Sequence, residues 1–119
     1  MLLANLSLMA ETKRLADEVA ALTGRIDLLF NNAGGVRDGR YVTSEGLEET
    51  FSANHLAPFL LTRELLPLLR AAAASSSPGA ARVIATSSKA YMTAAGGMAW
   101  DDIQHLTGDF SAAMVYCEA

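Results

Sequence analysis

The sequence predicts an α/β fold built on a parallel sheet, and three features support that prediction. Two apolar runs, residues 26–30 and 82–86, are too short for helices and are interpreted as buried strands. Two stretches with helical apolar periodicity, residues 9–23 and 45–70, precede and separate these runs. Residues 1–6 are also apolar and have the composition expected for the tail of a strand. Strand, helix, strand, helix, strand is the order that gives parallel strands joined by right-handed crossovers.

The first predicted helix, residues 9–23, is amphipathic. Ser7 is expected to cap its start, because a serine hydroxyl can accept a hydrogen bond from a backbone N–H of the first turn. Gly24 follows the last periodic position and is expected at the C′ stop. The stripe that should face the core consists of Leu15, Ala16, Val19, Ala20 and Leu22.

The second predicted helix, residues 45–70, is long and has one apolar stripe. Thr43 or Ser44 is expected to cap it. Acidic residues follow in its first turn, where the positive end of the helix dipole favours them. These acids are Glu45, Glu48 and Glu49. The stripe consists of Leu47, Phe51, Asn54, His55, Pro58, Thr62, Leu65, Leu66 and Leu69.

Pro58 interrupts the hydrogen bonding of this second helix. Proline has no N–H, and in an α-helix the missing group would have bonded the carbonyl of Asn54, four residues earlier. The helix is therefore expected to bend near Asn54. The residues alone favour a tolerated kink filled by a water, and the alternative is a carbonyl offered to a catalytic water chain.

The remaining segments predict connections rather than further strands. Residues 35–41 form a polar loop punctuated by glycine, and residues 71–80 a surface connection rich in alanine and serine. Residues 89–111 have no clear period and predict an irregular segment with room for one helical turn. Residues 112–119 begin a further apolar element.

Length, charge and cysteine content exclude several classes of protein. With 119 residues the chain forms at most one domain. A net charge of −4 gives no basic surface for nucleic acid. Cys117 is the single cysteine, which excludes an internal disulfide and a cysteine-based zinc cage. A reducing compartment fits this composition, and the expected location is the cytoplasm.

Two further classes are excluded by pattern. No apolar run is long enough to span a membrane, and the apolar start at residues 1–4 lacks the positive region of a signal peptide. His55 and His105 have no partner at metal-ligand or catalytic-triad spacing. Both are interpreted as structural or surface residues, and no metal site is expected.

The strongest candidate for a binding site is the tetrapeptide Asn31-Asn32-Ala33-Gly34, which directly follows the first buried strand. Open α/β sheets bind ligands at the carboxyl ends of their strands, and glycine permits close backbone approach to a flat ligand. The alternative is structural: asparagines at a strand end commonly tie neighbouring loops together.

Polar side chains also follow the second strand. If the sheet is parallel, Ser87 and Ser88 lie beside the end of the first strand. Two serines after a strand are commonly turn or capping residues, and Tyr116, in an apolar segment, is by itself most simply a core residue.

Together these residues resemble the short-chain dehydrogenase/reductase family. That family has Asn-Asn-Ala-Gly after its fourth strand, an Asn in the next helix, a Ser ending the fifth strand and then Tyr-x-x-x-Lys. The run from Thr43 to Leu56 and the long interval before Tyr116 resemble its retinol-dehydrogenase-like branch. The resemblance implies catalytic roles for Asn54, Ser88 and Tyr116. It implies cofactor contacts for Asn5, Asn31, Asn32, Ala33, Gly34 and Thr86.

The family's chemistry follows from the resemblance. Tyr116 would move the proton of an alcohol or carbonyl, Ser88 would hydrogen-bond the substrate oxygen, and the backbone carbonyl of Asn54 would hold a water. Hydride transfer would belong to NAD or NADP, without a basis here for choosing between them. The implied substrate is a small hydrophobic alcohol, aldehyde or ketone, and the implied parent is a homo-oligomer.

The sequence also departs from the family. It contains no Thr-Gly-x-x-x-Gly-x-Gly turn, and the Lys of Tyr-x-x-x-Lys would come directly after Ala119. We therefore expect residues 1–119 to be a partial NAD(P)-binding, Rossmann-like domain, the central βαβαβ portion of a larger doubly wound parallel sheet. Activity of this chain by itself is left open, and the alternative is a catalytically inactive fragment acting as an interaction module.

Overall fold

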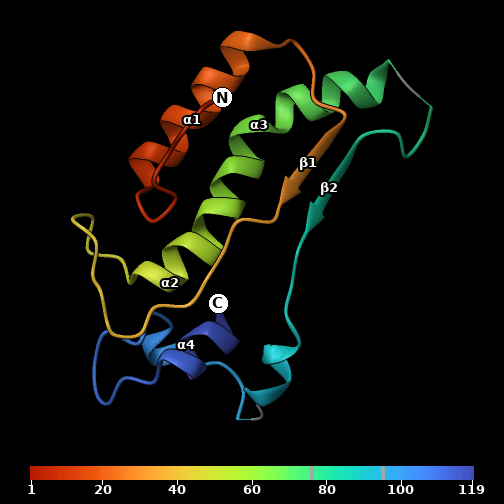
Figure 1. The fold of residues 1–119 in the computed structure, drawn as a ribbon. Helices are drawn as coiled ribbons and strands as arrows, with labels where there is room; N and C mark the ends of the chain where they lie inside the picture. Colours follow the sequence, from red (N-terminus) through yellow and green to blue (C-terminus); the bar gives the residue numbers. More distant parts are fainter. Residues whose placement is uncertain (76, 95) are drawn as a thin grey trace.

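The computed structural model describes residues 1–75, 77–94 and 96–119, and its elements alternate between helices and strands (Figure 1). The strands are β1 and β2, the α-helices α1 to α4, and the π-helical and 3₁₀ turns η1 to η3. In chain order they are α1 (Met9–Leu22), β1 (Leu28–Asn31), α2 (Glu49–Phe51), η1 (Ser52–Leu56), α3 (Ala57–Ala74), β2 (Arg82–Ala85), η2 (Lys89–Thr93), η3 (Trp100–Asp102) and α4 (Ala112–Glu118).

The two strands pair in parallel, which confirms the predicted sheet type. Their register runs from Leu28 opposite Arg82 to Asn31 opposite Ala85. The chain between them forms α3, the crossover that a parallel pair requires. Both strands therefore end at the same edge of the sheet (Figure 1).

The prediction of a third strand at residues 1–6 is wrong. Among the described residues the sheet has two strands, and this segment pairs with neither. A strand needs a neighbour for its backbone groups, and here the local side chains offer a turn instead. The Asn5 side-chain oxygen accepts hydrogen bonds from the backbone N–H of Ser7 at 3.1 Å and from its hydroxyl at 2.8 Å.

Helix α1 begins with a cap from a distant part of the chain. The predicted Ser7 cap is wrong, because the N-cap residue is Leu8. The Glu45 carboxylate instead accepts from the backbone N–H groups of Met9 at 2.6 Å and Ala10 at 3.0 Å. A negative charge at this end is favoured by the helix dipole. The predicted stop is confirmed, since the helix ends at Leu22 and Gly24 lies two residues beyond it.

The long helix begins later than residue 45. Its N-cap is Glu48, whose carboxylate accepts from the backbone N–H of Phe51 at 2.6 Å, so the predicted Thr43 or Ser44 cap is wrong. Gly46, with φ +76°, explains the difference, because a left-handed residue cannot continue a right-handed helix. From Glu49 the chain stays helical through η1 and α3 to Ala74.

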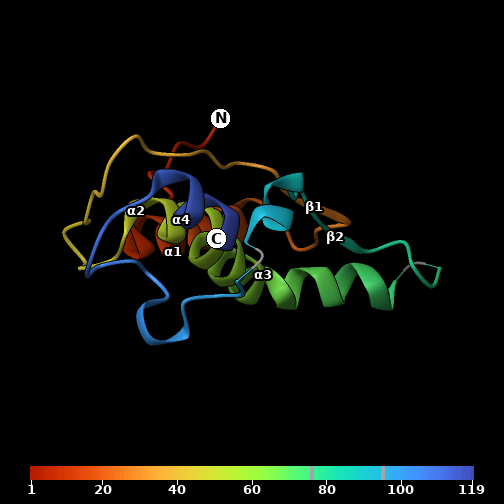
Figure 2. The ribbon, with the colours of Figure 1, turned by 90° about the horizontal axis from the view of Figure 1, so that it is seen from below.

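Helices α1 and α3 pack against each other, and α3 also packs against β1 (Figures 1 and 2). The Asn31 amide donates to the Thr62 hydroxyl of α3 at 3.0 Å, so the face of β1 that includes Asn31 is the one turned toward α3. None of the described helices is both long and apolar enough to cross a membrane. The buried apolar residues are Ala16, Phe51, Ala57, Leu65, Leu69, Ala72 and Val115.

Candidate functional site

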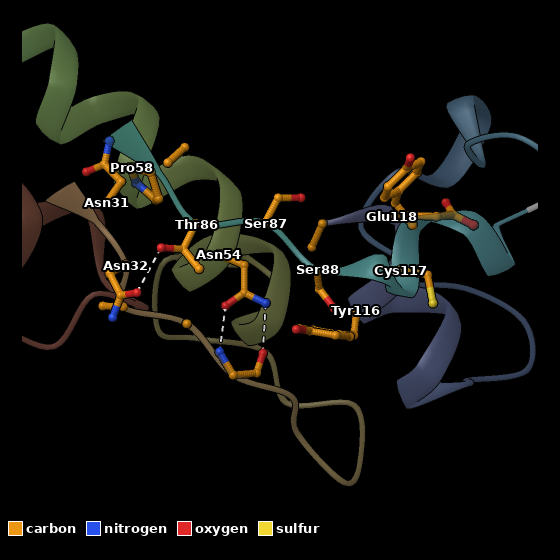
Figure 3. A pocket seen from close by; sticks show the side chains of 16 residues that line it. Asn31, Asn32, Asn54, Pro58, Thr86, Ser87, Ser88, Tyr116, Cys117 and Glu118 are labelled. Carbon is orange, nitrogen blue, oxygen red and sulfur yellow. Dashed lines mark hydrogen bonds between the residues drawn. The ribbon is translucent and has the colours of Figure 1, made fainter. Parts of the chain in front are cut away.

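A cavity of about 410 Å³ lies at the carboxyl ends of β1 and β2 (Figure 3). The segments after both strands, the start of the long helix and the last turn of α4 enclose it. Its lining residues are Asn31, Asn32, Ala33, Gly34, Gly35, Asn54, Pro58, Ala85, Thr86, Ser87, Ser88, Tyr91, Tyr116, Cys117, Glu118 and Ala119.

The fold brings almost all of the predicted site residues to this cavity. The three predicted catalytic residues line it from three separate places in the chain: Asn54 from η1, Ser88 from the segment between β2 and η2, and Tyr116 from α4. All of the predicted cofactor contacts except Asn5 line it as well. Asn5 borders a second, smaller cavity of about 210 Å³. The two cavities share the wall formed by Ala33, Gly34, Gly35 and Asn54.

The Asn54 side chain holds the backbone of Gly35 by both of its polar groups. Its oxygen accepts from the Gly35 N–H at 3.0 Å, and its amide donates to the Gly35 carbonyl at 2.7 Å (Figure 3). Gly34 lies so close that a Cβ there would be 3.1 Å from the Asn54 side-chain oxygen. Sequence reasoning assigned Asn54 a backbone role and missed this side-chain clamp.

The asparagines at the end of β1 tie it to neighbouring elements. Asn31 bonds Thr62 of α3, and the Asn32 side-chain oxygen accepts from the Thr86 hydroxyl at 2.8 Å (Figure 3). The latter bond joins the two strand ends just beyond the sheet, where the Thr86 N–H also donates to the Asn31 carbonyl at 3.0 Å. These side-chain bonds fix the shape of the cavity wall.

Asn54 lies in the π-helical turn η1, four residues before Pro58, which is the second residue of α3. In this turn the Ala57 N–H donates to the Ser52 carbonyl, five residues earlier. A proline cannot make the α-helical bond to the Asn54 carbonyl, and a π-turn is one way for a helix to absorb that loss. The predicted irregularity near Asn54 thus takes the form of a π-turn. Such turns are frequent at functional sites.

Ser88 and Tyr116 approach the cavity from the C-terminal half of the chain. Ser88 caps the 3₁₀ turn η2, because its hydroxyl oxygen accepts from the Ala90 N–H at 3.2 Å. Tyr116 lies on α4, whose N-cap Ser111 accepts from the Met114 N–H at 3.4 Å. Figure 3 shows the Ser88 and Tyr116 side chains directed into the same space below the Asn54 amide.

Sequence reasoning missed one group at the edge of this cavity. The Glu118 carboxylate contacts the Nε2 atom of His105 at 3.2 Å and accepts from the Ala99 N–H at 3.0 Å. His105 lies thirteen positions before Glu118, at no spacing typical of a helix or strand, so no local pattern signals the pair. His55, the other histidine, stacks on Phe51 with ring centroids 5.2 Å apart and fits the structural role expected of it.

Curated proteins match most of this chain. Human retinol dehydrogenase 13 is 34% identical over 115 residues, which cover 97% of this chain and 32% of the relative. A 3-oxoacyl-[acyl-carrier-protein] reductase of rhamnolipid biosynthesis from Pseudomonas aeruginosa is 39% identical over 100 residues, 82% of this chain and 38% of the relative. The chain thus spans about a third of the length of these curated relatives.

Solved structures share the fold. The RhlG/NADP active-site complex from Pseudomonas aeruginosa matches with a TM-score of 0.63 and 30% identity over 97% of this chain and 40% of that one. The NADH-dependent reductase A1-R' in complex with NAD matches with a TM-score of 0.65 and 28% identity, covering 98% of this chain and 43% of that one. Because the short chain dehydrogenase profile also matches residues 1–100, this α/β chain belongs to the short-chain dehydrogenase family and resembles its retinol dehydrogenases.

Proposed function

We propose that this chain forms the catalytic part of an NAD(P)-dependent oxidoreductase that interconverts a hydrophobic alcohol and its carbonyl. The supporting observation is the convergence of Asn54, Ser88 and Tyr116, from three separate segments of the chain, on one cavity at the ends of two parallel strands. In this proposal residues 1–119 are part of an NAD(P)-binding, Rossmann-like domain. The names of the retinol dehydrogenases support a hydrophobic alcohol as substrate.

Tyr116 is the proposed general acid and base. A phenol is protonated at neutral pH, so it can give a proton to a carbonyl oxygen that is being reduced. In the reverse direction it takes the proton of the alcohol, and a nearby cation that favours phenolate makes that step easier. In the family this cation is the lysine of the Tyr-x-x-x-Lys motif.

Ser88 is the proposed hydrogen-bond donor to the substrate oxygen. Its oxygen accepts from the Ala90 N–H, which helps to hold the hydroxyl oxygen in place. A hydroxyl donates as well as accepts, so the same group can donate to an oxygen in the cavity. A donor aimed at that oxygen stabilises the negative charge that develops on it.

The residues at the end of β1 fit a nicotinamide cofactor. The turn at Gly34 and Gly35 presents backbone to the cavity, and a Cβ at Gly34 would lie only 3.1 Å from the Asn54 side-chain oxygen. Asn32, Ala33, Gly34 and Thr86 would hold the cofactor there, with Asn31 supporting the strand end. When bound, NAD(P) supplies or accepts the hydride. Asn5, at the neighbouring cavity, remains a proposed contact to a more distant part of the cofactor.

Substitution of Tyr116 tests the proposal. In the protein that contains this chain, Tyr116→Phe removes only the hydroxyl and should lower kcat by about 10²–10⁴-fold. Ser88→Ala should lower it by about 10²-fold through loss of one donor. Ser87→Ala is the matched control and should do much less, because neighbouring residues of an extended segment point in opposite directions. Near-normal turnover of Tyr116→Phe in steady-state kinetics would show that the catalytic assignment is wrong.

We further propose that the parent protein is a cytoplasmic homo-oligomer. The single cysteine of the chain fits a reducing compartment, and homo-oligomers are the commonest assemblies of soluble proteins. Fractionation of cells and light scattering of the purified protein test the two statements separately.

A further inference from the structure

The segment at residues 99–108 connects two parts of the site that are far apart in sequence. The Gln104 side-chain oxygen accepts from the backbone N–H of Glu48, the residue that caps α2. The next residue, His105, contacts Glu118 at the end of α4. Two adjacent side chains thus join the helix that leads to Asn54 with the helix that carries Tyr116. Figures 1 and 2 both show this segment beside the loop that precedes α2.

The contact at Glu118 is well shielded from solvent. The Glu118 side chain is 5% exposed and the His105 ring 16% exposed. One carboxylate oxygen faces both the Ala99 N–H and the His105 ring. A buried carboxylate is costly unless it is hydrogen-bonded, so these partners hold Glu118 in place.

A fixed turn presents the His105 ring to Glu118. His105 has φ +49°, a conformation uncommon for residues other than glycine, and its N–H donates to the Asp102 carbonyl at 2.7 Å. The Asp102 carboxylate closes the same turn by accepting from the N–H groups of Leu106 and Thr107, each at 2.9 Å. The ring position is therefore set by the turn.

Helix α4 is held by contacts with other elements, since it packs against η2 and α2. The buried Val115 anchors its middle, and the Ser111 cap its start. Glu118 anchors its end, and Figure 3 shows the Glu118 side chain directed away from the Tyr116 phenol.

We propose that Glu118 is a positioning residue, which holds α4 through Ala99 and His105 and so sets the place of Tyr116 in the cavity. An effect of Glu118 on catalysis rests on the proposed function of Tyr116. Its effect on the position of α4 does not. Glu118 touches neither Tyr116 nor, in this proposal, the reacting atoms. It acts through the helix on which Tyr116 lies.

Amide hydrogen exchange of α4 and the fluorescence emission of Trp100 test whether Glu118 holds α4 in place. Neither measurement depends on enzyme activity. Trp100 is the only tryptophan of the sequence and directly follows Ala99. In Glu118→Ala the amides of α4 should exchange about tenfold faster or more, and Trp100 emission should shift. Glu118→Gln should restore both toward wild type, because its amide oxygen can still accept from the Ala99 N–H.

The exposed Asp101 supplies the matched control, since Asp101→Ala removes a carboxylate from the same segment and should leave α4 unchanged. A second variant, His105→Asn, tolerates the left-handed conformation but removes the ring, and it should also loosen α4. Wild-type exchange in both Glu118→Ala and His105→Asn would overturn the proposal. If Tyr116→Phe keeps near-normal turnover while Glu118→Ala still loosens α4, only the proposed function is contradicted. The two failures are therefore distinguishable.

Discussion

One side chain, Asn54, determines the shape of the turn after β1. Its amide pairs with both backbone groups of Gly35, as a neighbouring strand would. Asparagine is suited to this role because its side chain carries a donor and an acceptor on one carbon, like a peptide group. The proposed use of the Asn54 backbone carbonyl leaves this clamp intact, because the two functions use different atoms.

The first prediction concerns the space beside that clamp. In Gly34→Ala the new methyl group would lie 3.1 Å from the Asn54 side-chain oxygen, so one of the two must move. We expect a loss of about 1–2 kcal/mol in the free energy of unfolding, measured by urea denaturation. Gly35→Ala is the control, since nothing lies within 4 Å of its Cβ position. Equal stability of the two variants would show that the Asn54 side chain can move aside at no measurable cost.

The second prediction concerns pH and Asp102. The side-chain hydrogen bond from Thr107 lowers the pKa of Asp102, and the backbone N–H groups of Thr107 and Leu106 lower it further. A carboxylate with a lowered pKa stabilises the fold above the pKa of the unfolded chain, near pH 4, and this contribution disappears as the pH falls through the lower folded value.

Acid should therefore open the turn at Asp102. We expect the amides of Leu106 and Thr107 to be protected from hydrogen exchange at pH 6 and to lose protection relative to the rest of the chain below about pH 4. Asp102→Asn should weaken that protection at pH 6 and remove its pH dependence, whereas Asp101→Asn should keep the wild-type profile. Unchanged relative protection in acid would contradict the assignment.

At the scale of elements, the helix from Glu49 to Ala74 combines two geometries. Its first part contains the π-turn η1 with Asn54, and its second part is the regular α3 that packs on α1. Pro58 lies at the junction, and Pro67 lies within α3, away from the lining of the cavity. The irregular part faces the site and the regular part builds the core.

The third prediction compares these two prolines. Pro58→Ala restores an N–H that can bond the Asn54 carbonyl, so the free energy of unfolding should rise by about 1 kcal/mol. Activity of the parent enzyme should fall, because the carbonyl is then no longer available to a water. Pro67→Ala should raise stability with no change in activity. If Pro58→Ala also leaves kcat unchanged, the carbonyl is not used and the clamp is the main role of Asn54.

At the scale of the whole molecule, one face of the sheet lies open. Leu28 and Phe30 point away from the face that meets α3, since residues alternate along a strand, and they are 51% and 59% exposed. Exposed apolar area of this kind marks an interface or an aggregation liability. This observation is the one that favours the alternative role as an interaction module.

The fourth prediction follows from that face. The 119-residue chain by itself should self-associate at micromolar concentration, as measured by sedimentation velocity. Phe30→Lys should reduce the association, because a lysine on an open strand disfavours further packing. Val36→Lys, at an exposed apolar position in a loop, is the control and should change it little. A wild-type chain that sediments as a monomer at all concentrations would refute the prediction.

The sequence by itself determined the parallel pair of strands, the two long helices and most of the polar residues that line the cavity. Apolar runs and helical periods are local signals, since burial acts on each segment according to its own pattern. The polar residues could be placed because parallel strands end at one edge, which brings Asn32 and Thr86 together whatever the details of packing. The family resemblance then selected Ser88 and Tyr116 among otherwise ordinary residues.

Tertiary structure alone decided how those elements are fastened. Residues 1–6 have strand composition but no partner strand in the part of the chain that the structure describes, and a ladder of hydrogen bonds needs two strands. The cap of α1 comes from Glu45, 35 residues beyond Ala10, and the end of α4 is held by His105. Local patterns cannot encode such contacts, because a hydrogen bond depends on distance in space, and the fold sets that distance only once the core has formed.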